Sequence, residues 1–438
     1  MVNIGHLLSG SYMNTALGLV SVAIAARALG PSTFGALVII VTFCRLIGRI
    51  VRFDAWQALI KYAAEPAIEN DPEARSQLYA FGFVLDIVAG LVAMAITVAV
   101  VFAAGIFFGI DATDRWLVAI FSLTLVTALS SVPIAVLRLA NRFRLIAYTQ
   151  LVGNLLRIPL ALLCYWADTG LFGFVVAWTT AQIVNSLLLV WLCFRQIARD
   201  GTPSPIGVSL RGTLTRFNGI LGFAFSTNLS STLRTLTVEY DVLLVGGLAG
   251  PASAGFYHIA KRISKAAQQT GAQVQAVIYP DIARQWSRGQ FKDFRLSVLQ
   301  TQLGLTVIGI VMFLVLFLTG QPLLELVLGN EYVASYPILL VQVIAMILVL
   351  QAAPARSGLL AMGRARAVLV NTAISTTIFF AIALPLIPTM GAIGASIAHV
   401  ALGLYATISL NWLVYRGIHE KSSGQSQGAV PEVQARHS

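Results

Sequence analysis

Long runs of apolar residues are the feature that most constrains the fold of this chain. Residues 91–108 and 303–318 each contain a single threonine as their only polar side chain, and runs of this length cross a bilayer as helices. Only 11% of all residues are charged, against about 25% in an ordinary soluble domain. Strands of a membrane β-barrel would instead show short alternating segments. The sequence therefore predicts an all-α integral membrane protein.

Twelve segments are predicted to span the membrane, and the loops between them alternate in charge. One set of loops is basic, as in "RLANRFR" (138–144) and "GRAR" (363–366), and the other set is short or acidic, as in "ADTG" (167–170). Because basic loops stay in the cytoplasm, both termini are predicted to be cytoplasmic. These loops account for the net charge of +11, so no nucleic-acid partner is predicted. The predicted spans are residues 9–29, 36–60, 79–108, 116–138, 145–166, 171–194, 217–247, 255–280, 297–319, 335–360, 367–388 and 391–415.

The second half of the chain repeats landmarks of the first half at a shift of 220 to 222 residues. "GPSTFG" at 30–35 returns as "GPASAG" at 250–255, and Pro133 returns as Pro354. Glycine and proline punctuate the backbone, so their shared positions predict shared helix ends and kinks. Six spans per half make a parallel repeat, and transporters with such repeats bind substrate between the halves near the membrane midplane. Further matched pairs are Gly109 with Gly329, Arg142 with Arg364, Gly170 with Gly391 and Trp191 with Trp412.

The repeat predicts two lobes around a central cavity. We expect an N-terminal six-helix lobe over residues 1–200, a cytoplasmic linker between the lobes over 201–216, and a C-terminal six-helix lobe over 217–416. Residues 417–438 are rich in Ser, Gln and Gly, and this composition predicts a disordered cytoplasmic tail.

Basic side chains follow one face of the second predicted span. Arg45, Arg49 and Arg52 are spaced by four and three residues, which places them on one side of a helix, and we expect Trp56 to continue the stripe at the next turn. An arginine at the bilayer centre costs about 2.5–3.5 kcal/mol. A face turned toward a water-filled cavity avoids that cost. The alternative is that Arg52 extends to the membrane interface.

The eighth span is the repeat partner of the second and is also basic. Lys261 and Lys265 share a face with Tyr257, and Lys265 corresponds to Arg45 at the shift of 220. The two stripes predict a cationic cleft for an anionic head group, because guanidinium groups match phosphate geometry. A lipid-linked pyrophosphate suits such a cleft, and a cationic drug does not. Trp56 and Tyr257 either stack on sugar rings or fill space, and Lys261 could instead extend to the interface.

Acidic residues within the predicted spans have two possible roles, one structural and one in transport. In the seventh span, Arg234 adds to the basic cleft and shares a face with Asp241, while Glu239 lies to one side. Asp241 is either the counter-charge of Arg234 or a proton or cation carrier. Asp86, in the third span, either pairs with Arg157 of the fifth span or takes part in transport.

The sequence contains no motif for catalysis or nucleotide binding. No Gly-Lys dipeptide occurs, so there is no Walker A loop, and the three cysteines (Cys44, Cys164 and Cys193) have spacings that suggest neither disulfides nor a metal site. The predicted external loops are all short, whereas glycan polymerases usually need a sizeable one. We therefore predict a protein that is not an enzyme and uses no cofactor.

Two stretches carry a resemblance to a known family: "ALGPSTFGALVIIVTFCRLIGRIV" (28–51) and "EYDVLLVGGLAGPASAGFYHIAKRIS" (239–264). They resemble the polysaccharide-transport branch of the multidrug/oligosaccharidyl-lipid/polysaccharide exporter superfamily, which includes Wzx-type oligosaccharide flippases. The resemblance extends through about Arg416. It implies two six-helix lobes forming a V, with the first, second, seventh and eighth spans lining the cavity.

The resemblance also implies a function. Such a protein moves undecaprenyl-pyrophosphate-linked oligosaccharide from the inner to the outer leaflet of the bacterial cytoplasmic membrane by alternating access, for O-antigen, capsule or exopolysaccharide synthesis. The implied partners are the lipid-linked glycan, membrane lipid and the polysaccharide polymerase or export machinery. Ion coupling would use Asp86, Glu239 or Asp241. Two alternatives stay open: a cation-coupled multidrug exporter of the same superfamily, and a membrane glycan polymerase or ligase.

Overall fold

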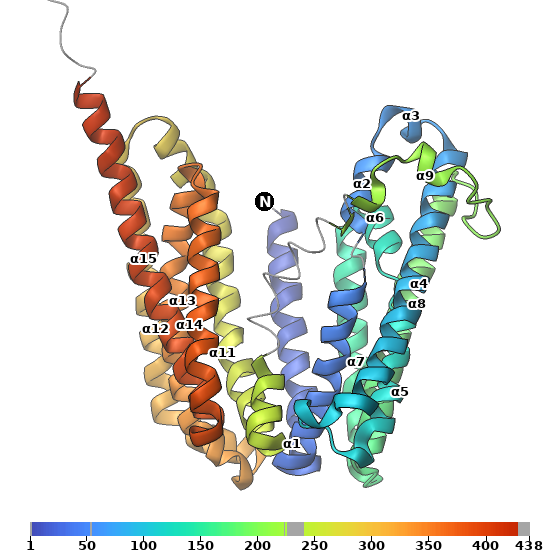
Figure 1. Cartoon of the computed structure of the whole chain (residues 1–438), viewed down its shortest axis with the longest axis horizontal. Helices are drawn as coiled ribbons and strands as arrows, with labels where there is room; N and C mark the ends of the chain where they lie inside the picture. The colour runs from blue at the N-terminus through green and yellow to red at the C-terminus, as the bar shows by residue number, and fades with distance from the viewer. Residues whose placement is uncertain (1, 53–54, 223, 226–240, 428–438) are drawn as a thin grey trace, which may run out of the picture. The chain divides into compact units, whose positions relative to one another are not determined.

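The described residues form α-helices joined by short loops and 3-10 turns (Figure 1). Ten helical segments among them are long and apolar enough to cross a membrane, which confirms the predicted all-α integral membrane protein. The computed structural model describes the backbone of residues 2–52, 55–222, 224–225 and 241–427, and the side chains of these residues except 2–12, 66, 266–280 and 422–427.

Two of the ten segments each hold parts of two predicted spans. Helix α1 (Val2–Val51) joins the first span to the second, and α11 (Asp241–Ser287) joins the end of the seventh span to the eighth. Each contains one non-helical glycine, with φ 70° and ψ 169° at Gly30 and φ 82° and ψ 169° at Gly250. Essentially only glycine adopts this conformation. The twelve-helix layout therefore holds, with the chain folding at the glycine of each repeated motif.

The loops before α7 (Phe143–Trp166) and α14 (Ala365–Met390) also have the same conformation. Asn141 (φ 56°) and Gly363 (φ 77°) are left-handed at matching positions. The next residues, Arg142 (φ −91°, ψ 43°) and Arg364 (φ −91°, ψ 45°), precede the helices with nearly identical dihedral angles. The internal repeat in the sequence is thus a repeat of backbone geometry.

The two repeated Gly-Pro motifs pack against each other. A Cβ atom added to Gly35 would lie 1.8 Å from the carbonyl oxygen of Pro251, and one added to Gly255 would lie 2.6 Å from the carbonyl oxygen of Pro31. All four residues belong to the first of two compact units, Met1–His258 with Val327–Glu331. The contact is reciprocal, since each motif places a glycine against the proline carbonyl of the other. We call it the glycine crossing.

In the first unit, α4 and α5 pack against α1, and α8 packs against α5 and α7. A cluster of buried residues including Leu59, Leu78, Val132 and Phe217 joins α2, α4 and α6 at one end of this unit. Besides α1 and α7, the described α-helices that lie wholly within this unit are α2 (Trp56–Ala63), α3 (Pro66–Glu69), α4 (Pro72–Ala104), α5 (Arg115–Thr127), α6 (Ser131–Leu139), α8 (Gly170–Arg199) and α9 (Thr213–Arg216).

The fourth predicted span lies within the apolar segment Ala112–Leu139, but its helix is interrupted. Helix α5 ends at Thr127 and α6 begins at Ser131, whereas the repeat partner α13 (Tyr336–Ala361) continues through Pro354. The sequences explain the difference. "SSVP" (130–133) places a proline in the first turn of α6, where its missing N–H breaks no helical hydrogen bond. The second half has "QAAP" (351–354) there, and its helix continues.

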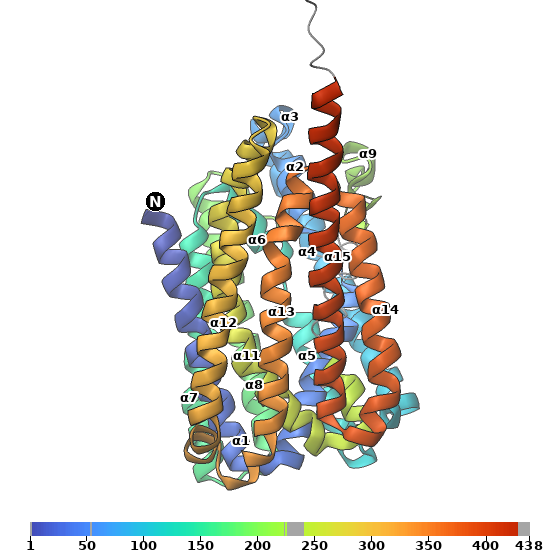
Figure 2. The same ribbon diagram turned by 90° about the vertical axis from the view of Figure 1, so that its left-hand side faces the viewer.

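The second unit comprises Ile259–Leu326 and Tyr332–Ser438. Helices α13 and α14 both pack against α15 (Ala392–Gln427), as Figure 2 shows. Phe294 of α12 (Phe291–Leu328) is fully buried in a core with Leu359 and Leu410. A short 3-10 turn, Asn330–Ser335, connects α12 to α13.

The two units divide within α11, so residues 241–258 pack with the first unit although the repeat assigns them to the second half. The lobe limits 1–200, 201–216 and 217–416 stay a prediction from the repeat. The disordered tail predicted from 417 is wrong at its start, because α15 continues to Gln427. Residues 428–438 lie outside the described part of the chain.

Large apolar side chains are exposed along α4 and α12. Val88 of α4 is 52% exposed, and Val311 and Leu318 of α12 are 55% and 73% exposed. Contiguous patches of this kind are rare on soluble monomers. They are expected on a helix that faces hydrocarbon, where the backbone bonds internally and apolar side chains need no cover. These faces support insertion of the helices in a membrane.

Candidate functional site at the broken helix

The break between α5 and α6 lies near the middle of the predicted span 116–138. It leaves backbone groups that have no partner within their own helices. The carbonyl oxygen of Ala128 accepts a hydrogen bond from Nη2 of Arg52. At the other side of the break, the backbone N–H of Ser131 donates to Oδ2 of Asp86 (2.9 Å), and the Ser131 hydroxyl donates to Oδ1 (2.7 Å). Backbone groups within a bilayer need such partners because no water is available to bond them.

The signs of these charges match the helix ends that they meet. Arg52 is a cation at the negative C-terminal end of α5, and Asp86 is an anion at the positive N-terminal end of α6. Asp86 is only 2% exposed, so its carboxylate oxygens need such hydrogen-bond donors. Arg52 was predicted to line the cationic cleft or to extend to the interface, and Asp86 to pair with Arg157 or to take part in transport. The structure gives each of them a partner at the broken helix.

Glycines let the three helices around the break approach closely. A Cβ atom on Gly48 of α1 would lie 2.7 Å from the side chain of Leu125 in α5. One on Gly90 of α4 would lie 2.6 Å from the Leu125 carbonyl oxygen. Small residues serve the same purpose at many interfaces between membrane helices. Here they bring Arg52 and Asp86 within bonding distance of α5 and α6.

Arg45 and Arg49 lie on α1, two turns and one turn before Arg52. Arg45 is exposed and Arg49 is half-buried. Since the helix is continuous to Val51, the three arginines follow one face over roughly 10 Å at 1.5 Å per residue. We call these three residues the arginine stripe.

Trp56 does not continue this stripe, and that prediction is wrong. The α1 helix ends at Val51, and Trp56 begins the separate helix α2. The guanidinium carbon of Arg138, from α6, lies 3.9 Å from the centroid of the Trp56 ring. A cation therefore already occupies one ring face, at cation–π distance.

Asp241 and Tyr257 form a buried pair that sequence reasoning missed. The Tyr257 hydroxyl donates to Oδ2 of Asp241 at 2.5 Å, and the side chains are 0% and 3% exposed, respectively. The two residues lie on opposite sides of the kink at Gly250, so a fold-back at that glycine was the signal for the pair. Tyr257 has no exposed ring face, which favours the space-filling alternative over sugar stacking. Arg234 and Glu239, predicted beside Asp241, lie outside the described residues.

The predicted lysines of the eighth span lie on α11 in the second unit. Lys261 and Lys265 are one turn apart and half-buried. Between them, Ser264 is fully buried, and its hydroxyl donates back to the carbonyl oxygens of Ala260 (2.8 Å) and Lys261 (3.1 Å). The serine thus bonds its own helix, and the charged groups of this turn are Lys261, Arg262 and Lys265.

A second polar cluster joins α1, α7 and α8. Nη2 of Arg157 donates to the Gln182 amide oxygen at 3.1 Å, and the Asn154 amide donates to the Asn14 side-chain oxygen at 2.5 Å. Arg157 was proposed as a partner for Asp86, whose bonds to Ser131 place it at the broken helix instead. The amides Asn154 and Gln182 were not singled out from the sequence, although each interrupts an apolar span.

Comparisons with known proteins agree with this architecture. Residues 24–337 match the family model described as polysaccharide biosynthesis protein. The inner membrane protein YghQ of Escherichia coli K12 is 29% identical over 339 residues, which cover 77% of this chain and 94% of that protein.

Two solved structures share the fold at low sequence identity. An inward-facing multidrug resistance MATE family transporter of the MOP superfamily aligns with a TM-score of 0.72 and 14% identity, over 95% of this chain and 96% of its own. The lipid II flippase MurJ, in an inward closed conformation, aligns with a TM-score of 0.72 and 15% identity, over 94% of this chain and 89% of its own. The family match extends over more than half of the sequence and confirms the resemblance seen there. This chain belongs to the polysaccharide biosynthesis protein family and has the fold of the MATE and MurJ transporters.

Proposed function

We propose that this protein is a flippase of the bacterial inner membrane, with both termini in the cytoplasm. Its cargo is a polyprenyl-pyrophosphate-linked oligosaccharide, moved from the cytoplasmic to the outer leaflet for surface polysaccharide synthesis. The arginine stripe carries this proposal, because it places three cations along one face of a helix in an apolar bundle. Membership of a polysaccharide biosynthesis family supports a glycan as the cargo.

Within the stripe, the three arginines have different tasks in this proposal. Arg52 holds the carbonyl group of Ala128 at the helix break. Arg45, the exposed member, and Arg49 contact the pyrophosphate, whose charge of roughly two to three units suits two guanidinium groups. Lys261 and Lys265 are assigned to phosphate binding from the repeat in the sequence. The polyprenyl chain stays in the bilayer while the head group crosses, by alternating access of the two repeats.

Any coupling ion is assigned to Asp241 or Glu239 ahead of Asp86, because Asp86 holds the N-terminus of α6. The protein performs no covalent chemistry in this proposal and requires no cofactor. A polysaccharide polymerase or export complex would receive its product at the outer leaflet.

A multidrug exporter is the second candidate, favoured by the shared fold with the MATE transporter. Those exporters commonly place an acid in the first lobe, and the described part of the first predicted span contains none. A basic stripe also repels cationic drugs. A membrane polymerase or ligase is the third candidate, and the short loops between the helices do not favour it.

The experiment measures the leaflet occupied by the lipid-linked glycan after deletion of the gene. Cells are extracted for polyprenyl-pyrophosphate sugars, and accessibility of the glycan is assayed from each side of the membrane. A flippase predicts accumulation on the cytoplasmic side, corrected by the wild-type gene. Complete units accumulating on the outer side would indicate a polymerase or ligase. An unchanged pool with altered drug tolerance would indicate a drug exporter.

The arginine stripe gives a prediction for the same assay. Arg45→Ala and Arg49→Ala should each fail to restore export, with normal amounts of protein in the membrane, because a phosphate contact is lost. Arg45→Lys should restore export in part if charge suffices, and fail if a planar two-pronged donor is required. Arg199→Ala, at the exposed end of α8, is the control and should restore export fully. Full export by both Arg45→Ala and Arg49→Ala would refute the assignment.

A further inference from the structure

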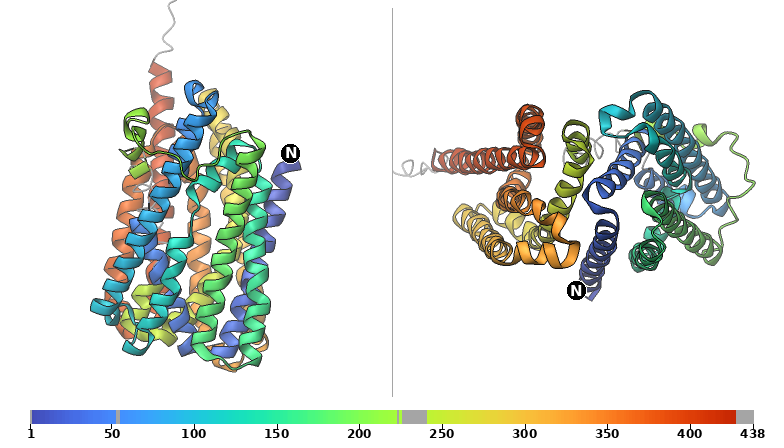
Figure 3. Two further views of the ribbon diagram at one scale, coloured as in Figure 1. Left: turned by 90° about the vertical axis from the view of Figure 1, so that its right-hand side faces the viewer. Right: turned by 90° about the horizontal axis from the view of Figure 1, so that it is seen from below.

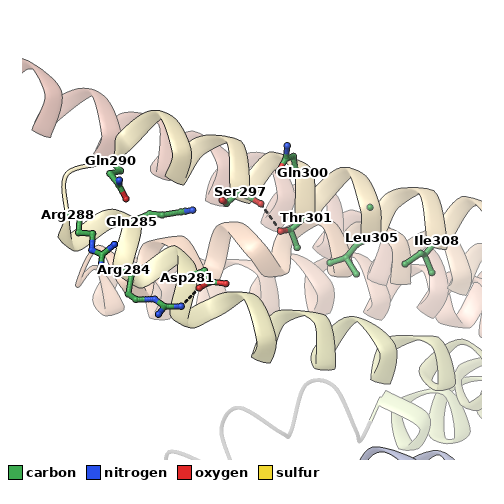
Figure 4. A pocket seen from close by; sticks show the side chains of 11 residues that line it. Asp281, Arg284, Gln285, Arg288, Gln290, Ser297, Gln300, Thr301, Leu305 and Ile308 are labelled. Atoms are coloured by element: carbon green, nitrogen blue, oxygen red, sulfur yellow. Dashed lines mark hydrogen bonds and ion pairs between the residues drawn. The ribbon is translucent and has the colours of Figure 1, made fainter. Parts of the chain in front are cut away.

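A groove lies between α11 and α12 in the second unit (Figure 4). Its volume is about 670 Å³. Arg284 and Arg288 lie toward one end, and Leu305 and Ile308 lie toward the other. The lining residues are Asp281, Arg284, Gln285, Arg288, Gln290, Ser297, Gln300, Thr301, Gly304, Leu305 and Ile308.

The polar end of the groove carries positive charge. Arg284 shares its guanidinium with the carboxylate of Asp281, one turn earlier on α11, and Arg288 is exposed one turn later. Two arginines against one aspartate leave the lining with a net charge of +1. The guanidinium groups of Arg284 and Arg288 thus give this end donors for an anion.

The other end of the groove is apolar and continuous with the lipid-facing surface of α12. Ser297 and Ile308 are eleven residues apart, which is roughly 17 Å along a helix. Outside the groove, α12 exposes Leu303 (66%), Val307 (51%) and Val311 (55%). Gly304 leaves open space at the base of the groove, since a Cβ atom added there meets no atom within 4 Å. The groove therefore has a cationic end, and its other end continues into an apolar surface suited to contact with lipid chains.

We infer that this groove binds an anionic phospholipid from the leaflet at this end of the helices. Its phosphate lies against Arg284 and Arg288, and one acyl chain lies over Gly304, Leu305 and Ile308. Basic pockets between membrane helices bind phospholipid head groups in this way. A soluble anion would leave the apolar length uncovered. The inference does not depend on the proposed cargo, because none of these residues belongs to the arginine stripe.

Three variants separate the head-group contact from the acyl-chain contact. The double variant Arg284→Gln/Arg288→Gln removes the cations. Gly304→Leu adds a side chain whose Cβ atom meets no atom within 4 Å, and it replaces glycine by a strong helix former, so we expect the fold to be retained. Arg295→Gln is the matched control, since Arg295 is an exposed arginine at the start of α12 that does not line the groove.

The measurement is native mass spectrometry of the purified full chain in detergent, with dioleoyl-phosphatidylglycerol or dioleoyl-phosphatidylcholine added at equal concentration. We expect wild type and Arg295→Gln to retain one phosphatidylglycerol at least five-fold more often than phosphatidylcholine. The double arginine variant should lose this preference, and Gly304→Leu should lose the adduct itself.

Several results would overturn the inference. One is equal retention of the two lipids by wild type, and another is loss of the preference in Arg295→Gln as large as in the double variant. Displacement of the bound lipid by sn-glycerol 3-phosphate at the same concentration would show a site for soluble phosphate. Displacement by an equal concentration of undecaprenyl phosphate would show a site for the polyprenyl carrier. The export assay is read separately, and normal export in Gly304→Leu leaves the proposed function unaffected.

Discussion

Single glycines decide how closely the helices of this protein approach one another. Gly35 and Gly255 each lie where a methyl group would overlap the carbonyl oxygen of a proline in the other motif. Gly30 and Gly250 adopt a backbone conformation that other residues avoid, so the same short motif supplies both the kink and the contact. The kinks could be expected from the repeated Gly-Pro sequences. The contact could not, because its two sides are 220 residues apart.

The glycine crossing gives the first stability prediction. Gly35→Ala places a Cβ atom 1.8 Å from the Pro251 carbonyl oxygen, so the backbone must move, and overpacking costs about 1–3 kcal/mol or more. Gly255→Ala, at 2.6 Å from the Pro31 carbonyl oxygen, should cost less. The measurement is the melting temperature of the detergent-purified protein. Gly304→Ala is the control, and should be neutral or stabilising by up to about 1 kcal/mol. Equal melting of all three variants would contradict the tight contact.

At the scale of elements, the broken helix α5–α6 separates what the sequence could predict from what it could not. The spans and their kinks follow from apolar runs, Gly and Pro, which act locally. The break at 128–130 depends on Arg52 and Asp86, which come from other helices. The serines at 130–131 were a local sign of a helix start, but they lie in an apolar run that reads as one span. The second half lacks those serines, and α13 is continuous.

The cap on α6 predicts a structural role for Asp86 that can be separated from a transport role. Asp86→Ala leaves the buried N–H of Ser131 without its acceptor, and should lower the free energy of unfolding by about 1–3 kcal/mol. Asp86→Asn keeps one acceptor and should cost less. Melting temperature and export are measured on the same variants. A variant Asp86→Asn that melts like wild type and exports nothing would support ion coupling by Asp86 and contradict the structural role.

At the scale of the whole molecule, the predicted linker 201–216 lies against the first unit (Figures 1 and 3). The Gln77 amide donates to the carbonyl oxygens of Ser209 (3.1 Å) and Arg211 (3.2 Å), and Arg216 pairs with Asp71 at 2.6 Å. The sequence predicted a cytoplasmic loop from its charge. Its attachment could not be predicted, because the partners lie more than a hundred residues away in polar segments with no periodic pattern.

The linker attachment predicts a dependence on pH. Hydrogen bonding from the Ala74 backbone N–H, together with Arg216, holds the pKa of Asp71 below its usual value. A lowered pKa means that the attachment is complete above the unfolded value of about 4 and is lost as the pH falls through the folded value. At pH 7, Asp71→Asn should therefore speed amide hydrogen exchange in residues 204–216.

The amide exchange rates of residues 204–216, corrected for the intrinsic rate, should differ less between Asp71→Asn and wild type below about pH 4. Glu69→Gln is the control, since Glu69 is an exposed acid on the neighbouring helix α3. It should exchange like wild type at both pH values. Exchange in Asp71→Asn equal to wild type at pH 7 would show that the ion pair does not hold the linker.

The reciprocity of the glycine crossing has a consequence for how the two halves can change. In a dimer with two-fold symmetry, each contact across the interface occurs twice, once in each direction. The glycine crossing has this isologous geometry within one chain. In a homodimer, one mutation changes both sides of the interface. In this chain the two sides are encoded separately, so one mutation changes only one side. Gly35 and Gly255 each leave room for a proline carbonyl oxygen of the other motif, so substitution of either glycine disturbs the shared interface. Residues away from the crossing are not under this constraint, and there one half has a broken helix with charged partners at its ends while the other half has a continuous helix.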